Sequence, residues 1–195
     1  MGRTLFGMIL GLILAPLLVL AWFRWGNPPV AVADPPLPFE RQIVHVPLNR
    51  RIDRDKPEAP TIPVDEMNLN AGAGIYRDDC AACHGFYGKP SPFAAHMYPK
   101  APQLWQKHKN GSAVGVSDDP PGETYWKVAN GIRLTGMPAF DDMLSPTQIW
   151  QVSLLLANAD KPLPPGALAI VRDEQPQTEA PAPAPPKGSA KAAPK

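Results

Sequence analysis

The sequence predicts an all-α fold, in which a helical domain over residues 65–165 follows an N-terminal membrane-spanning helix. Three observations support this prediction. An uncharged apolar run opens the chain, a segment typical of a helix ends at Gly131, and a helix-capping pattern begins at Ser145. Proline accounts for 27 of the 195 residues and is concentrated before residue 65 and after residue 161. The part of the chain able to build a core is therefore its middle.

The first element is the run from Leu5 to Phe23, which as a helix would cross about 28 Å of hydrocarbon. Residues 1–23 are therefore predicted to be a membrane anchor. Membrane helices tolerate the internal Pro16, and the Trp22–Trp25 segment places two tryptophans and an arginine at the far interface. The alternative is a signal peptide cleaved after residues 31–33 (Ala-Val-Ala), although the apolar run is longer than such peptides usually have. Under either interpretation, the rest of the chain is expected to be exported.

Two proline-rich segments flank the predicted domain. Residues 24–64 are expected to form an extended linker, which at ~3.1 Å per residue would reach roughly 130 Å. Within this linker, residues 42–46 (QIVHV) have strand-like composition, and a docked strand there is the alternative to a passive stalk. Residues 166–195, rich in alanine, proline and lysine, have little to bury and are predicted to be a disordered tail.

The segment Cys80-Ala81-Ala82-Cys83-His84 contains the only two cysteines of the chain. This C-x-x-C-H spacing is typical of covalent attachment of a c-type haem, because thiols one helical turn apart can add to the two vinyl groups and deliver the adjacent imidazole to the iron. A redox dithiol would need a βαβ setting, and a zinc knuckle would need further cysteine or histidine ligands nearby. The surrounding sequence offers neither. One haem c is therefore expected, with Cys80 and Cys83 as attachment points and His84 as proximal iron ligand.

A second axial ligand is expected further along the chain, and Met137 is the best candidate. Gly136 precedes it and Pro138 follows it, which favours a tightly held loop over a core methionine. The sequence leaves four other side chains and an open sixth position as alternatives. The side chains are Met97, Met143, His96 and His108.

Two helices are expected around this loop. Residues 122–130 precede a glycine C-cap at Gly131, and Tyr125 and Trp126 on this helix are predicted either to pack in the core or beside the haem or to hydrogen-bond a haem propionate. The last helix opens with a capping box of Ser145 and Gln148, and the face from Ile149 to Leu156 is apolar. Ser153 on that face is small enough for another helix to cross there.

Residues 65–160 resemble the class I c-type cytochromes, in particular the small monohaem domains of membrane-anchored carriers and of oxidase or dehydrogenase subunits. Gly72 and Tyr76 stand where that family has a glycine and an aromatic on its N-terminal helix. The resemblance implies that Gly72 lets another helix approach closely and that Tyr76 packs beside it. Asn70 is a candidate N-cap of this helix. The resemblance implies that the Pro102 carbonyl accepts a hydrogen bond from His84, although Pro102 would also suit an ordinary loop. Where the family often has a tyrosine in its last helix, this chain has residues 154–156, all leucine.

The function expected from these features is one-electron transfer, with no catalytic activity of its own. A net charge of +1 argues against nucleic-acid binding. Histidine and methionine together would saturate the iron, so the chain is predicted to exchange electrons with protein partners in or at the membrane. The alternatives are a fixed haem subunit of a larger membrane enzyme and a gas-binding sensor. The resemblance implies a bacterial cytoplasmic membrane, with one pass and the haem domain in the periplasm.

Overall fold

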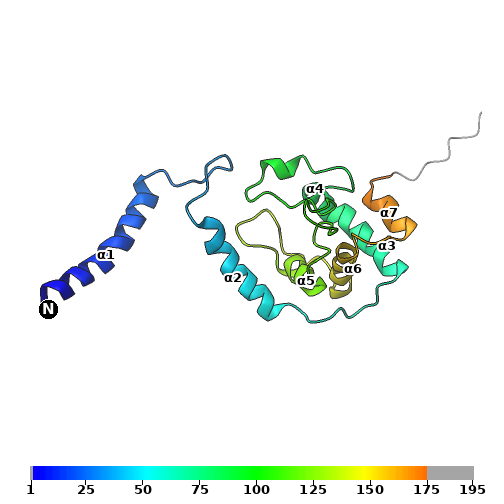
Figure 1. Ribbon diagram of the computed structural model, residues 1–195, viewed down its shortest axis with the longest axis horizontal. Coiled ribbons are helices and arrows are strands. Elements are labelled where there is room, and N and C mark those ends of the chain that lie inside the picture. The colour runs from blue at the N-terminus through cyan, green and yellow to red at the C-terminus, as the bar shows by residue number, and fades with distance from the viewer. Residues whose placement is uncertain (1, 175–195) are drawn as a thin grey trace, which may run out of the picture.

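The computed structural model describes residues 2–174, and these form helices and loops with no β-strand among them (Figure 1). The all-α prediction is therefore confirmed. The first helix stands apart from a globular domain that contains the other elements. In chain order the helices are α1 (Gly2–Trp25), α2 (Glu40–Asp55), α3 (Glu66–Ile75), η1 (Tyr76–Cys80, a π-helical turn), α4 (Ala81–His84), η2 (Phe93–His96, a 3-10 turn), α5 (Pro121–Asn130), α6 (Pro146–Ala157) and α7 (Pro165–Val171).

The apolar run at the N-terminus forms one continuous helix, α1, of 24 residues. None of its side chains is buried against the rest of the chain. Pro16 lies inside the helix, and Arg24 in its last turn lies over the ring of Trp25. By length and composition α1 is able to cross a membrane.

The core of the domain is built where α3 crosses α6. Gly72 faces the backbone of Gln151 and Val152 so closely that a methyl group at residue 72 would collide with the Gln151 carbonyl. The predicted close approach at Gly72 is therefore confirmed. Ser153, the next residue of α6, is fully buried, and its hydroxyl donates to the Ile149 carbonyl within the helix.

Both predicted helices around the methionine loop are present. α5 ends at Gly131, which has a φ of 64°, and α6 begins with the predicted capping box of Ser145 and Gln148. The rings of Tyr125 on α5 and Trp150 on α6 lie 4.4 Å apart between centroids. This contact joins the two helices, so Trp150 packs where α5 meets α6.

The expectation that residues 24–64 are extended is wrong for residues 40–55, which form α2. This stretch contains a single proline, Pro47, and its C-terminal half is stabilised by ion pairs one turn apart, such as Arg51 with Asp55. Ile52 is only 2% exposed. α2 therefore packs on the domain beside α5. The strand that was the alternative for residues 42–46 is also wrong, because these residues belong to α2.

Two boundary expectations also need correction. The N-cap of α3 is Asp65, whose carboxylate accepts from the Asn68 amide, and Asn70 lies inside the helix. The domain does not end at residue 165 either, because α7 packs on α3 and buries Ala167 and Val171 completely. A short apolar run inside the predicted tail supplies this helix. The remainder of that tail, residues 175–195, lies outside the described residues.

Candidate functional site

The cysteine motif lies where α3 passes into the π-helical turn η1 and the short helix α4. Cys80 ends η1, and Cys83 and His84 end α4, so both thiols and the imidazole come from two consecutive turns of helix. Both cysteines are partly buried and are not joined in a disulfide. Burial, together with the negative charge of Asp79, raises the pKa of the Cys80 thiol to about 12. In the bare chain at neutral pH this thiol is therefore protonated.

The imidazole of His84 is fixed by one backbone contact. Its Nδ1 lies 2.7 Å from the Pro102 carbonyl oxygen, which is the hydrogen bond that the resemblance implied. Burial lowers the pKa of His84 more than this hydrogen bond raises it, which favours the neutral ring. A neutral ring that donates from Nδ1 keeps the lone pair of Nε2 for a metal.

The loop that carries Pro102 is tied to the motif by a residue that the sequence analysis missed. The side-chain amide of Gln103 donates to the Cys83 carbonyl at 3.2 Å, and its oxygen accepts from the Ser91 amide at 2.7 Å. The Leu104 amide also donates to the His84 carbonyl. Gln103 lies between Pro102 and Leu104, and a polar side chain between two apolar residues could have indicated that it forms hydrogen bonds inside the domain.

The residue after His84 is held by Tyr76. Its hydroxyl donates to the Gly85 carbonyl at 2.6 Å, and its fully buried ring meets the edge of Trp105 at 5.6 Å between centroids. Trp105 was also missed, although its position directly after the Pro-x-Leu segment, in a chain with few aromatics, could have indicated it. Tyr76 and Trp105 thus support the motif from the side of the core.

Met137 lies on a tightly held loop between α5 and α6. Its backbone is fixed by two hydrogen bonds. The Met137 amide donates to the Thr135 hydroxyl at 3.1 Å, and the Met137 carbonyl accepts from the Ile132 amide at 3.2 Å. Gly131 is required at the start of the loop, since a side chain there would meet the Pro138 carbonyl carbon at 2.6 Å. The Met137 side chain is half-buried and packs against the core.

The alternative ligands occupy different surroundings. The Met97 methyl group reaches the same loop, because a side chain at Gly136 would meet it at 2.5 Å. His96 is exposed, and Met143 is 67% exposed. His108 is engaged within its own loop, where Nε2 lies 2.8 Å from the Gly115 carbonyl oxygen. The structure thus brings Met97 to Gly136, in the loop that carries Met137, and Met137 as the iron ligand remains a prediction.

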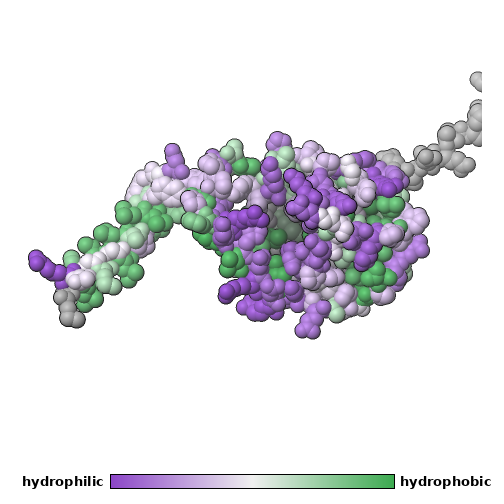
Figure 2. Space-filling model, viewed as in Figure 1, coloured by the Kyte–Doolittle hydropathy of each residue, from purple (hydrophilic) through white to green (hydrophobic). Residues whose placement is uncertain are grey.

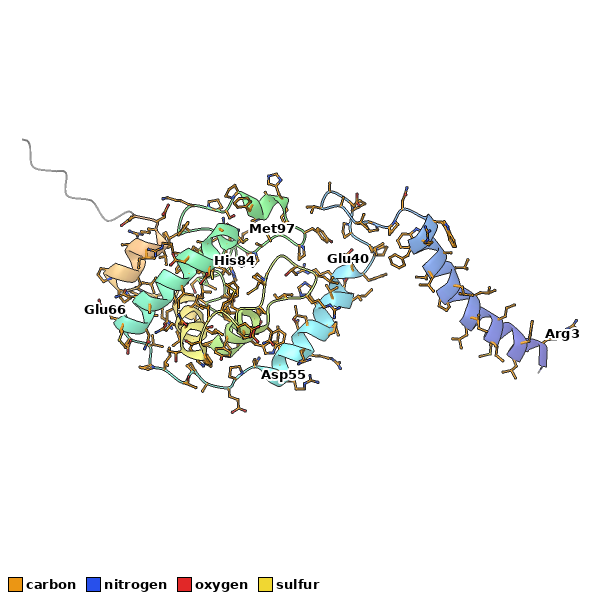
Figure 3. All side chains as sticks on the ribbon, turned by 180° about the vertical axis from the view of Figure 1, so that it is seen from behind. Arg3, Glu40, Asp55, Glu66, His84 and Met97 are labelled. Carbon is orange, nitrogen blue, oxygen red and sulfur yellow. The ribbon has the colours of Figure 1, made fainter. Side chains whose placement is uncertain are left out.

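A hollow opens on this face of the domain, in the region where Figure 1 shows α4, the η2 segment and the loop after α5 (Figure 2). Figure 3 labels His84 and Met97 near each other in the same region. Three apolar side chains, Cys80, Tyr125 and Met137, pack on the core and remain partly uncovered on their other side. Trp126 is half-buried as well. These half-buried side chains, the thiols of the motif and a neutral imidazole fit the predicted haem.

Within residues 2–174 no group of three or more histidine, cysteine, aspartate or glutamate side chains is arranged to hold a metal ion directly.

Comparison with protein families gives one match. Residues 67–154 match the model of the family described as cytochrome C oxidase, cbb3-type, subunit III. The match spans the motif, the Pro102 loop, the methionine loop and most of α6. Comparisons with curated proteins and with solved structures gave no match.

Proposed function

Because residues 67–154 form a class I c-type cytochrome domain, which transfers electrons through haem, we propose that this chain is a membrane-anchored one-electron carrier. In this proposal Cys80 and Cys83 hold a single haem covalently, and His84 and Met137 are its axial ligands. The haem iron supplies the redox chemistry by alternating between its ferric and ferrous states. The chain itself holds, orients and shields that group.

The observation that carries the proposal is the 2.7 Å contact between His84 Nδ1 and the Pro102 carbonyl oxygen. A carbonyl oxygen only accepts hydrogen bonds, so the Nδ1 atom must carry the proton and Nε2 must carry the lone pair. The hydrogen bond also fixes the ring plane and makes the imidazole a stronger ligand. A histidine held in this way, directly after two helix-spaced thiols, is prepared for an axial position.

Met137 completes the proposal from the opposite loop. A thioether ligand favours ferrous iron and raises the reduction potential, and two strong axial ligands leave no position for oxygen or a substrate. The loop suits this task because Thr135 and Ile132 fix the backbone on both sides of the methionine side chain. Little rearrangement is then needed when the oxidation state changes.

The membrane part of the proposal depends on α1. Its 24 residues have no buried side chain and end in a tryptophan and arginine segment typical of an interface. We propose that α1 crosses the cytoplasmic membrane once and leaves the haem domain in the periplasm. Arg3 and Arg24 flank the span almost symmetrically, so the haem, which is attached outside the cytoplasm in related proteins, decides the orientation.

The test is the spectrum of the full-length protein purified from membranes. We expect a covalently bound haem, the weak red absorption band that methionine gives with ferric haem, and no rapid carbon monoxide binding by the ferrous form. A protein with rapid carbon monoxide binding and no such band would overturn the carrier proposal in favour of a gas-binding sensor.

A second candidate, a fixed haem subunit of a membrane oxidase, is favoured by the family that residues 67–154 match. Gentle solubilisation of native membranes distinguishes it from a free carrier. A fixed subunit would copurify with its partners in constant proportion at high salt, whereas a shuttle would be recovered alone.

A further inference from the structure

α2 carries an unpartnered face that the electron-transfer site does not use. Phe39, just before the helix, and Ile43 and Val46 on it are 74%, 67% and 56% exposed. The spacing of three residues places Ile43 and Val46 on one side of the helix. Phe39, the N-cap, accepts from the Ile43 amide at 3.0 Å and so adjoins the same end of the helix. Ile52 follows Ile43 by nine residues, which is half a turn out of phase, and it is the residue buried against the domain. The exposed apolar side chains therefore point away from the domain.

The same face becomes basic toward its C-terminal end. Arg50 and Arg54 continue the line of Ile43 and Val46 at helical spacing, and all the arginines of α2 are exposed. Arg51 and Arg54 share a single carboxylate, Asp55, while Arg50 has no ion-pair partner among residues 2–174. The face thus keeps a net positive charge beside its apolar part.

α2 is joined firmly to the domain that carries the haem motif. Beyond its C-terminal end, the Pro57 carbonyl lies against Gly122 of α5 so closely that a side chain at residue 122 would collide with it. At its N-terminal end, the Glu40 carboxylate lies beside the Tyr98 hydroxyl and raises the pKa of that group. The orientation of α2 therefore sets the orientation of the haem domain.

The short loop between α1 and α2 indicates which surface this face of α2 meets. Only residues 26–39 separate the end of α1 from the start of α2, and this loop includes the exposed Val30 and Val32. Figure 1 shows α2 running crosswise to α1, at the level where α1 ends, with the domain beyond it. A helix in that position lies along a bilayer surface rather than above it.

We propose that α2 lies on the outer surface of the bilayer that α1 crosses, with Phe39, Ile43 and Val46 among the upper acyl chains and the arginines on anionic phospholipid headgroups. Apolar and basic side chains on one helix face are the combination that binds such a surface. The patch also follows the proposed lipid-facing helix α1 after a loop of residues 26–39. The inference rests on the proposed membrane anchor.

The experiment uses the full-length holoprotein in vesicles of phosphatidylethanolamine and phosphatidylglycerol, with a photoreactive phenylalanine analogue in place of Ile43. We expect covalent adducts with lipid after illumination. The same analogue in place of Met67, which is 71% exposed, is the control. Figure 3 labels the neighbouring Glu66 at the end of the molecule opposite Arg3, so this position should give no lipid adduct.

A third position separates failure of the anchor from failure of the inference. The analogue in place of Leu12, in the middle of α1, must give lipid adducts if the anchor is inserted. Lipid adducts at residue 12 without any at residue 43 would overturn the surface position of α2 and leave the anchor standing. Adducts between residue 43 and a second copy of the chain would overturn it in favour of a dimer. No lipid adduct at residue 12 would overturn the anchor and the inference with it.

The charge contribution is measured with the variant R50Q/R54Q. Because an arginine near an anionic surface strengthens binding roughly fivefold, we expect the lipid adduct yield at residue 43 to fall severalfold. The matched control K107Q/K161Q removes two exposed lysines elsewhere and should leave the yield unchanged. An equal yield in vesicles of phosphatidylcholine alone would overturn the role of the arginines. The haem spectrum of each variant verifies that the domain is folded.

Discussion

Tyr76→Phe is the substitution that tests most directly how the core supports the cysteine motif. The change keeps the ring that packs against Trp105 and removes only the hydroxyl that donates to the Gly85 carbonyl at 2.6 Å. That carbonyl has no other donor within residues 2–174, so the variant leaves a buried acceptor unsatisfied. The free energy of unfolding should fall by about 2 kcal/mol. For a domain of this size the melting temperature should fall by roughly 10 °C.

The pH dependence of this loss has a defined sign. Burial, as the main cause, raises the pKa of Tyr76 far above its ordinary value of 10.0. Above pH 10 the unfolded chain loses the phenol proton while the native chain keeps it, so the native wild type loses stability at about 1.4 kcal/mol per pH unit. The variant has no phenol at residue 76. The difference between wild type and variant should therefore shrink by roughly 1.4 kcal/mol at pH 11.

The assay is denaturant unfolding of the holoprotein at pH 8, 10 and 11, followed by helical circular dichroism. Tyr87→Phe, which removes the hydroxyl of a 44% exposed tyrosine, is the matched control and should change stability by less than about 0.5 kcal/mol. A Tyr76→Phe variant as stable as the wild type at pH 8 would refute the hydrogen-bond argument. A difference that stays constant up to pH 11 would refute the buried, protonated phenol.

Three further predictions address the ligand, the α2 contact and the topology. Met137→Ala should keep covalent haem, because attachment needs only the motif, but should lose the red ferric band and have a lower reduction potential; an unchanged band would make Met97 the candidate ligand. Ile52→Ala should destabilise α2 by about 2–4 kcal/mol and speed trypsin cleavage after the arginines at 50, 51 and 54 without changing the haem spectrum, whereas Ile43→Ala, at an exposed position, should not. Protease added to intact spheroplasts should remove the haem domain, and a domain protected until lysis would contradict the periplasmic location.

The sequence alone predicted the structure correctly where a few neighbouring residues determine the backbone geometry. The capping box of Ser145 and Gln148 and the glycine that ends α5 are local devices, and both are present as predicted. The close approach at Gly72 and the contact between His84 and Pro102 involve residues further apart. These were reached through the resemblance to related cytochromes, since nothing in the local sequence indicates which partner they meet.

The errors arose where tertiary contacts outweigh composition. The prolines of residues 24–64 gave the whole segment an extended appearance, yet the stretch around Ile52 forms a helix once that side chain has a core to pack on. Residues 166–171 have the composition of a solvated tail, yet Ala167 and Val171 are fully buried in a helix that packs against α3. In both cases the deciding partner is more than 60 residues away in the sequence.

The position of α2 changes what the anchor implies about electron transfer. If residues 24–64 were wholly extended, the haem domain could reach roughly 130 Å from the membrane, and it could then meet redox partners at many different distances from the bilayer. With α2 folded onto the domain, only residues 26–39 are left as linker, and even fully extended they span no more than about 50 Å. A redox partner of the proposed electron-transfer protein would therefore have to meet the haem domain within this distance of the bilayer. A short linker therefore suits a partner that stands beside the anchor, whether the chain is a carrier or a fixed subunit.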